Sequence, residues 1–135
     1  MKKAEGTFSI VSWNESTARE RGEQKATRAT VEYSLGGGIN GQLFVEYVMF
    51  YAEFDPEDVH AGAAEFSGSI WFVGEINGLK GSFGAMDLGK YAAGEVESNF
   101  QIVQDSGRGD LRGIRGKGAY SAGQSGMKFD LNYEL

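Results

Sequence analysis

A glycine-rich stretch at residues 106–122 constrains the fold of this chain more than any other part of its sequence. Apolar side chains interrupt the glycines, and this mixture needs a backbone that is extended, kinked and closely approached by its neighbours. Such backbone is typical of the corners of a small closed β-barrel. The glycines of the stretch are Gly107, Gly109, Gly113, Gly116 and Gly118, and the apolar residues between them are Leu111, Ile114 and Tyr120.

Length and composition indicate a single domain that spans residues 1–135 and buries a core of its own. The chain has no cysteine, which excludes disulfides and thiolate sites. A formal net charge of −6 repels phosphate backbones and anionic lipid surfaces, so we expect neither nucleic acid nor a membrane as a partner. Residues 1–20 lack the continuous apolar run of a signal peptide, and no later segment reaches the roughly 20 apolar residues of a membrane helix. We therefore expect a cytoplasmic location.

Alternation of polar and apolar residues predicts an all-β protein. Residues 29–35 and 127–135 show most clearly the period of two that a half-buried strand requires. Asn77-Gly78 is the strongest hairpin signal in the chain. No segment has a sustained helical period, so the sequence predicts one eight-stranded antiparallel β-barrel with mostly up-and-down connections. The predicted strands are residues 6–13, 29–35, 42–54, 66–75, 79–88, 94–103, 117–122 and 127–135.

The first predicted strand changes face part of the way along. Phe8 and Ile10 share one face, whereas Val11 and Trp13 lie on the other, which indicates a bulge or a change of face. Residues 14–24 are charged and lack apolar periodicity, so a loop is expected there.

Residues 107–118 read G-R-G-D-L-R-G-I-R-G-K-G, which resembles the G-x-G-x-[LF]-x-G-x-x-G signature of allene-oxide-cyclase-like barrels and their dirigent relatives. Nearly the whole chain is similar to an uncharacterised bacterial family, a domain of unknown function, within that barrel superfamily. The order and spacing of several segments carry this resemblance. These are G-T-F-S-I-V-S-W at residues 6–13, T-R-A-T-V at 27–31, V-E-Y-V-M-F-Y at 45–51, F-S-G-S-I at 66–70, G-S-F at 81–83 and L-N-Y-E-L at 131–135.

The resemblance implies a barrel whose cyclase members hold a lipid-derived substrate inside and steer ring closure by confining its shape. Three residues, at two places in the chain, depart from the pattern that the resemblance implies. Ile70 stands where F-x-G-x-E would place a glutamate, and Met86 and Asp87 stand where a Gln-His pair is common. A site that relatives build from those polar residues would be altered in this chain.

Alternate residues of each strand line the interior of a β-barrel, so the lumen is the expected place for a small apolar ligand. The predicted ligand-binding residues are Tyr33, Tyr47, Met49 and Tyr51, with Trp13 near one mouth. Aromatic residues at strand spacing also fill ordinary cores, and packing is the alternative interpretation.

Glu46 and Asp87 are weak candidates for a catalytic carboxyl group. Glu46 lies in an otherwise apolar strand, and a desolvated carboxyl group there would suit general acid–base chemistry. Its parity also allows an outward position, paired with an arginine across the sheet. Asp87 shares the parity of Phe83 and would place a carboxyl group in the barrel mouth, unless it is a solvated residue at a strand end.

We expect no cofactor and no metal. Asp55, Glu57, Asp58 and His60 offer oxygen and nitrogen ligands, but their spacing matches no calcium loop and a second histidine is lacking. No nucleophile elbow lies near His60, which argues against a hydrolase. The glycine motif precedes a strand rather than a helix, which argues against dinucleotide binding.

Three functions are compatible with the sequence. The favoured one is a small β-barrel that binds an apolar small molecule in its lumen. The first alternative is an isomerase or cyclase that acts on a hydrophobic substrate, so the question of catalysis stays open. The second alternative is a purely structural homo-oligomer with a filled barrel. Residues 42–54 are apolar on both faces, and we therefore expect the chain to form a homo-oligomer.

Overall fold

The computed structural model describes residues 1–54, 57, 62–124 and 126–135, and the regular elements in these ranges are all β-strands. The described residues contain no helix, and hence none long and apolar enough to cross a membrane. The all-β prediction is confirmed. The strands are β1 (Lys2–Arg21), β2 (Gln24–Gly37), β3 (Ile39–Glu53), β4 (Ala63–Ile76), β5 (Leu79–Ala92), β6 (Glu95–Ile102), β7 (Arg108–Gly109), β8 (Arg115–Gly123) and β9 (Gly126–Glu134).

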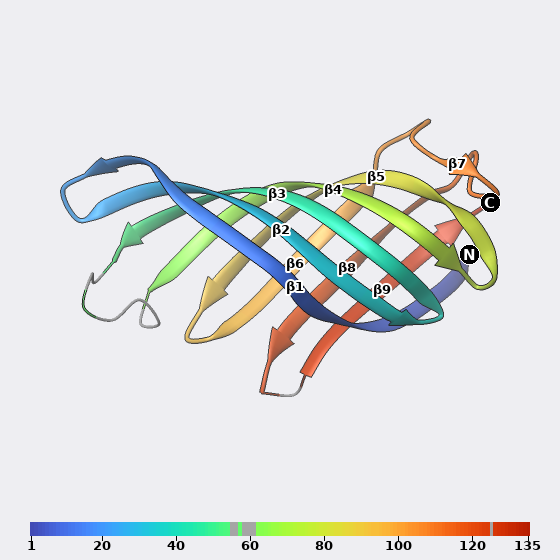
Figure 1. Ribbon diagram of the computed structural model, residues 1–135, viewed down its shortest axis with the longest axis horizontal. Helices are drawn as coiled ribbons and strands as arrows, with labels where there is room; N and C mark the ends of the chain where they lie inside the picture. Colours follow the sequence, from blue (N-terminus) through green and yellow to red (C-terminus); the bar gives the residue numbers. More distant parts are fainter. Residues whose placement is uncertain (55–56, 58–61, 125) are drawn as a thin grey trace.

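The strands form one antiparallel sheet in the order β4-β3-β2-β1-β9-β8-β6-β5-β7, and a further pairing of β4 with β5 closes it into a ring (Figure 1). Apart from β7, neighbours in the ring follow the order of the chain, as up-and-down connections require. The described residues form nine strands, one more than the eight predicted. The additional strand, β7, pairs only with Gly81 and Ser82 of β5. Two residues are too few to show any period in the sequence.

The structure also corrects the loop predicted at residues 14–24. β1 continues to Arg21 and β2 begins at Gln24, with both strands joined in one long hairpin. Backbone pairing with β2 builds this part of β1, so its side chains need no apolar period. The bulge predicted within residues 6–13 is confirmed, because the pairing register shifts between Ile10 and Ser12. This shift places Trp13 opposite the buried Val31.

β1 leaves β9 part of the way along the ring. The two strands pair over residues 2–7 of β1, and the last pair joins Thr7 to Lys128. Beyond Thr7, β1 pairs with β2 alone. The β1–β2 hairpin therefore projects away from the turn between β8 and β9, as Figure 1 shows. Backbone pairing between β1 and β9 does not close this end of the ring, which we call the open end.

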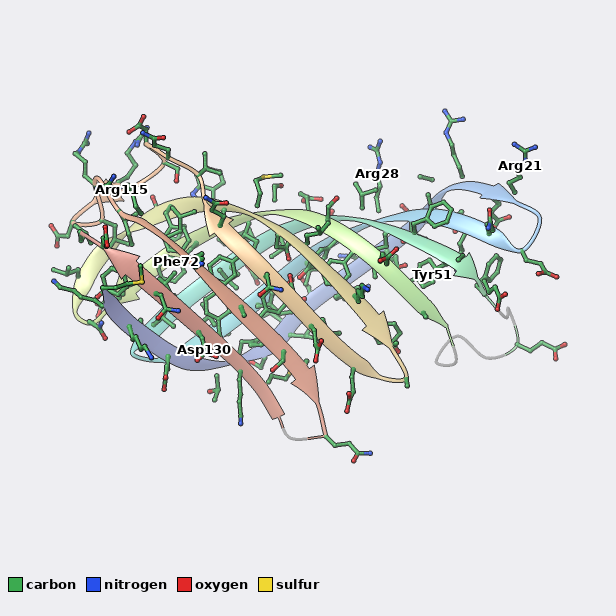
Figure 2. The ribbon with its side chains drawn as sticks, turned by 180° about the vertical axis from the view of Figure 1, so that it is seen from behind. Arg21, Arg28, Tyr51, Phe72, Arg115 and Asp130 are labelled. Atoms are coloured by element: carbon green, nitrogen blue, oxygen red, sulfur yellow. The ribbon has the colours of Figure 1, made fainter. Side chains whose placement is uncertain are left out.

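The opposite end, the closed end, is filled by apolar side chains. Residues 103–114 place Leu111 and Ile114 in the core, with exposed fractions of 0% and 1%. The amide of Asp110 donates a hydrogen bond of 2.8 Å to the carbonyl of Lys80, which holds this segment against β5. Figure 2 shows Phe72 inside this part of the sheet. The glycine-rich stretch thus packs one end of the ring.

Two glycines of the stretch show why larger residues do not fit. A Cβ atom at Gly118 would lie 2.1 Å from the carbonyl oxygen of Asp130 and 2.4 Å from the Phe100 ring. A Cβ atom at Gly107 would lie 2.1 Å from the carbonyl oxygen of Leu111. The predicted close approach of neighbouring backbone is confirmed at both positions.

The outer surface of β3, β4 and β5 carries exposed apolar side chains. Phe44 of β3 and Trp71 of β4 are direct cross-strand neighbours with exposed fractions of 41% and 63%. The second apolar face predicted for residues 42–54 is therefore exposed in the single chain. We call this surface the outer apolar patch; its residues are Phe44, Val48, Phe50, Trp71, Val73, Met86 and Leu88.

Replacing Gly118 by alanine is expected to lower the free energy of unfolding by about 1–3 kcal/mol, because the new Cβ would overlap the Asp130 carbonyl and the Phe100 ring. Gly36→Ala is the matched control. No heavy atom lies within 4 Å of a Cβ at Gly36, so this variant should change the free energy by less than about 0.5 kcal/mol. Urea denaturation measures both, and equal stability of the two variants would contradict the close packing.

Candidate functional site

A cavity of about 820 Å³ lies at the open end of the ring. All strands except β7 contribute to its walls. One side comes from the part of β1 that has left β9, which includes Ile10 and Trp13, and the facing side includes Ala122 and Met127. The departure of β1 from β9 therefore gives access to the interior.

The cavity brings together all five side chains that the sequence predicted to contact a ligand. Tyr33, Tyr47 and Met49 are buried in its wall, Tyr51 is half-buried, and Trp13 is 40% exposed. The indole of Trp13 stacks on the Tyr47 ring, with centroids 5.8 Å apart and planes inclined by 28°. Figure 2 shows Tyr51 on β3 toward the end of the β1–β2 hairpin. The bulge in β1 makes this grouping possible, because it turns Trp13 inward.

Three tyrosine hydroxyl groups meet beside the cavity. The hydroxyl oxygens of Tyr33 and Tyr47 lie 2.9 Å apart, and those of Tyr47 and Tyr120 lie 2.7 Å apart. The Tyr120 hydroxyl also donates a short hydrogen bond to Oδ2 of Asp87. We call Tyr33, Tyr47 and Tyr120 the tyrosine cluster. It connects the cavity wall to a carboxyl group through continuous hydrogen bonds.

Asp87 is buried, with an exposed fraction of 4%. The inward parity predicted for it is confirmed, whereas the interpretation as a solvated strand-end residue was wrong. Ser98 Oγ donates a hydrogen bond of 3.0 Å to Oδ2, and Oδ1 has no hydrogen-bond partner among the described residues. Gly68 lies opposite Asp87 on β4, where a Cβ atom would be 2.4 Å from Oδ1. The glycine therefore leaves the space that this carboxyl group occupies.

Burial disfavours the charged form of every group in this network. It raises the pKa of Asp87 above the ordinary value of 3.8, and the hydrogen bonds from Tyr120 and Ser98 lower it only in part. Burial also raises the pKa of Tyr33 to about 12 and raises the pKa values of Tyr47 and Tyr120. The tyrosines therefore keep their protons at neutral pH, and Asp87 is the group of the network whose protonation can change.

Glu15 organises the mouth of the cavity. Its Oε1 accepts a hydrogen bond of 3.0 Å from the indole nitrogen of Trp13. Its Oε2 accepts hydrogen bonds of 2.7 Å from Thr27 and 2.8 Å from the Tyr51 hydroxyl. These contacts tie β1 to β2 and β3 beyond the point where β1 leaves β9. Sequence reasoning missed Glu15 because it fell within the predicted loop.

Sequence reasoning also missed Ser98 and Tyr120. Ser98 shares the parity of Val96 and Phe100 in β6, which the alternation of residues 94–103 already indicated to be the inner face. Tyr120 has the corresponding inward parity in β8. Parity was therefore the available signal for both residues, although it does not reveal their shared contact with Asp87.

Glu46, the other carboxyl candidate, does not line the cavity because its side chain is on the outer face of β3. Its side chain is exposed, and it accepts a hydrogen bond of 2.8 Å from Thr30 Oγ1 on the neighbouring strand. The predicted outward position is confirmed, with a threonine as the hydrogen-bond donor in the described structure instead of an arginine. The burial that a catalytic role requires is absent at Glu46.

Within the described ranges, no three His, Cys, Asp or Glu side chains are grouped so that they would hold a metal ion. Asp55, Asp58 and His60, which the sequence analysis considered as ligands, lie outside the described residues. Glu57 of the same segment is described and exposed.

The difference in stability between the Asp87→Asn variant and the native protein is expected to grow as pH rises above 3.8. The folded state raises the pKa of Asp87, so between the unfolded and folded pKa values only the folded chain keeps the proton. The free energy of unfolding of the native protein therefore falls as pH rises between these two pKa values. Asparagine at position 87 does not titrate, so the variant does not show this fall. Urea titrations over a series of pH values test this, with the exposed Asp130→Asn as a matched control. A difference that does not depend on pH would contradict the assignment.

Comparison with known proteins gives a family and a fold. A family model described as "Protein of unknown function (DUF3224)" matches residues 4–133. The chain is similar to the crystal structure of a protein of unknown function from the DUF3224 family of Shewanella oneidensis MR-1, with a TM-score of 0.80 and 20% sequence identity. The alignment covers 100% of this chain and 97% of that one, and at this identity it shows a shared fold. No match was found among curated protein sequences.

These comparisons confirm the resemblance to an uncharacterised family, and neither of them extends it to the allene-oxide-cyclase-like superfamily. The match covers nearly every strand of the ring. The chain belongs to the DUF3224 family, a protein family of unknown function.

Proposed function

We propose that the protein is a small β-barrel that binds an apolar small molecule in its lumen, at the open end. The observation that carries this proposal is the cavity of about 820 Å³, with walls of aromatic and aliphatic side chains. Ligand pockets of proteins commonly have volumes of about 300–1,000 Å³, mostly apolar walls and a few placed polar groups. The tyrosine cluster supplies such polar groups at one place in the wall.

Ring contacts support the proposal because they hold the cavity wall in place without a ligand. Tyr47 and Phe66 meet edge to face with centroids 5.1 Å apart, and Phe8 and Tyr33 meet in the same way at 5.2 Å. A wall that is already ordered reduces the conformational entropy lost on binding. Binding would therefore need little rearrangement of the barrel.

The interior is divided between a packed half and a hollow half. Leu111 and Ile114 fill the closed end, whereas the open end contains the cavity. A purely structural role requires a barrel that is filled at both ends. The hollow half favours ligand binding over the purely structural role.

An isomerase or cyclase is the second candidate, and Asp87 is the observation that favours it. A buried carboxyl group with a raised pKa suits a general acid or base, and Tyr120 connects it to the cavity wall. This candidate also agrees with the resemblance of residues 107–118 to the allene-oxide-cyclase-like signature. Ligand binding in the cavity is its first requirement.

Ligand binding should be weakened when a larger side chain in the wall fills part of the cavity. Ala122 lines the cavity, so Ala122→Phe should weaken binding of acetylnaphthalene at least tenfold, about 1.4 kcal/mol. Ala92→Phe makes the same exchange at an exposed position on β5 and should leave the affinity unchanged. Calorimetric titration measures the affinity of both variants.

In a Trp71→Phe background, Trp13 is the remaining tryptophan, and its fluorescence should change on binding.

Native protein that binds no acetylnaphthalene, or an Ala122→Phe variant that binds it as tightly as the native protein, would contradict binding in the cavity. Circular dichroism of both phenylalanine variants separates loss of the site from loss of the fold.

Self-association through the outer apolar patch is a further expectation. Contiguous exposed apolar surface commonly marks an interface, and a patch that meets its own copy gives a symmetric oligomer. Static light scattering should give a mass greater than one chain. Leu88→Glu, at a patch residue that is 71% exposed, should lower this mass, whereas Val103→Glu outside the patch should not. A native mass equal to that of one chain would exclude the oligomer.

A further inference from the structure

The tyrosine cluster forms a continuous line of hydrogen bonds from the cavity wall to Asp87. Tyr33 contacts Tyr47, Tyr47 contacts Tyr120, and Tyr120 contacts Oδ2 of Asp87. Each hydroxyl group has one proton to donate, and each contact in the line uses one proton. If the group at one end of the line donates its proton, every hydroxyl group after it must donate in the same direction.

The protonation of Asp87 sets this direction. An ionised carboxylate only accepts, so Tyr120 donates to it, Tyr47 donates to Tyr120, and Tyr33 donates to Tyr47. A neutral Asp87 with its proton on Oδ2 donates to Tyr120, and each later hydrogen bond then reverses. Tyr33 at the far end keeps its own proton free in this state. A buried carboxyl group thus determines whether the cavity wall offers a hydrogen-bond donor or only acceptors.

The surroundings of Asp87 favour its neutral form. Ser98 faces it from β6, Tyr120 from β8, and Gly68 from β4 without a side chain. Burial raises its pKa, and no cation of the described residues is among the causes that shift it. When Oδ2 carries the proton, Ser98 Oγ has a second acceptor in the carbonyl of Leu88 at 3.4 Å. Ser98 therefore keeps a hydrogen-bond acceptor while Asp87 is neutral.

Glu15, the charged side chain among the described residues that line the cavity, lies at its mouth, and Lys25 contacts the rings of Tyr51 and Phe54 nearby. Glu15 accepts hydrogen bonds there from Trp13 and Tyr51. Lys25 Nζ lies 4.9 Å from the ring centroid of Tyr51 and 4.4 Å from that of Phe54. Beside the tyrosine cluster the described wall contains apolar side chains and no charged partner for a ligand. A ligand group that reaches the cluster is therefore best matched when it is neutral.

We propose that the cavity takes a neutral carbonyl compound, a ketone or aldehyde with an apolar body, whose oxygen accepts a hydrogen bond from the tyrosine cluster while Asp87 is protonated. The proposal rests on the proposed function, because it names the ligand class for the same cavity. A carbonyl oxygen only accepts hydrogen bonds, so it fits the donor state of the cluster and not the acceptor state. Ketone affinity is therefore full while Asp87 is neutral and falls as pH rises through its pKa.

Two naphthalene derivatives provide the test. Acetylnaphthalene and ethylnaphthalene share a ring system and differ in the carbonyl oxygen. At low pH, calorimetry of the native protein should give at least about tenfold higher affinity for the ketone. The stretching band of an isotope-labelled carbonyl should move to lower frequency on binding. As pH rises, the affinity for the ketone should fall while the affinity for the hydrocarbon stays constant.

Variants test whether the ketone preference and its pH dependence come from the line of hydrogen bonds between Tyr33 and Asp87. Tyr47→Phe interrupts the line and should remove both the preference for the ketone and its pH dependence, and Tyr120→Phe gives a second interruption if the first variant does not fold. Asp87→Asn keeps a donor beside Tyr120 at every pH, so the ketone preference should persist without the fall. Tyr133→Phe, at a buried tyrosine of the closed end, is the matched control and should behave as the native protein does.

The outcomes separate this proposal from the proposed function. Equal affinities for the two probes, with an unshifted carbonyl band, would overturn the ligand class and leave apolar binding intact. A ketone preference that does not change with pH in the native protein would overturn the role of Asp87. Tighter binding of naphthoate, the anionic counterpart, would overturn a neutral ligand. Failure of both neutral probes to bind would contradict the proposed function itself.

Discussion

The burial of Asp87 is the constraint on which the chemistry of this structure depends. A carboxyl group removed from water is costly in its charged form unless it is paired, so it is hydrogen-bonded, neutral or both. Tyr120 and Ser98 bond to one oxygen, and Gly68 leaves room for the other. Tyr47 continues the network to the cavity wall. These polar groups thereby meet at one place in the cavity wall, and most of the other described side chains that line the cavity are apolar.

The two ends of the ring differ because different segments complete them. At the closed end, the glycine-rich stretch turns Leu111 and Ile114 into the core and leaves no room there. At the open end, β1 stops pairing with β9 after Thr7, and the interior stays accessible. Glu15 compensates for the missing backbone pairs by tying β1 to neighbouring strands. One sheet can therefore carry a packed core and a ligand-sized cavity side by side.

Much of the fold could be predicted from the sequence because apolar and polar residues alternate along a half-buried strand, with one kind on each face. This period of two located Tyr33 and Tyr47 on the inner face and offered an outward position for Glu46, which the structure shows. The period failed at residues 14–24, where backbone pairing alone extends β1, and Glu15 was missed with them. β7 has two residues and is therefore too short to show a period in the sequence.

The central contact of the site, between Tyr120 and Asp87, could not be predicted from one sequence. The two residues are 33 positions apart, and β6 lies between their strands in the ring. Their side chains meet across β6 on the inner face of the sheet, so the contact depends on the pairing and curvature of three strands. Asp87 stands between Met86 and Leu88 near the end of the predicted strand, and neither fact shows that its carboxyl group is buried.

Binding of a carbonyl compound by the tyrosine cluster can be seen in a crystal structure of the protein grown at low pH with acetylnaphthalene. We expect the naphthalene rings inside the cavity at the open end, between Trp13 and the facing wall of β8 and β9. The carbonyl oxygen should lie within hydrogen-bond distance of a hydroxyl of the tyrosine cluster. A ligand on the outer surface, or one in the cavity with its oxygen turned to the mouth and away from the tyrosines, would exclude this mode of binding.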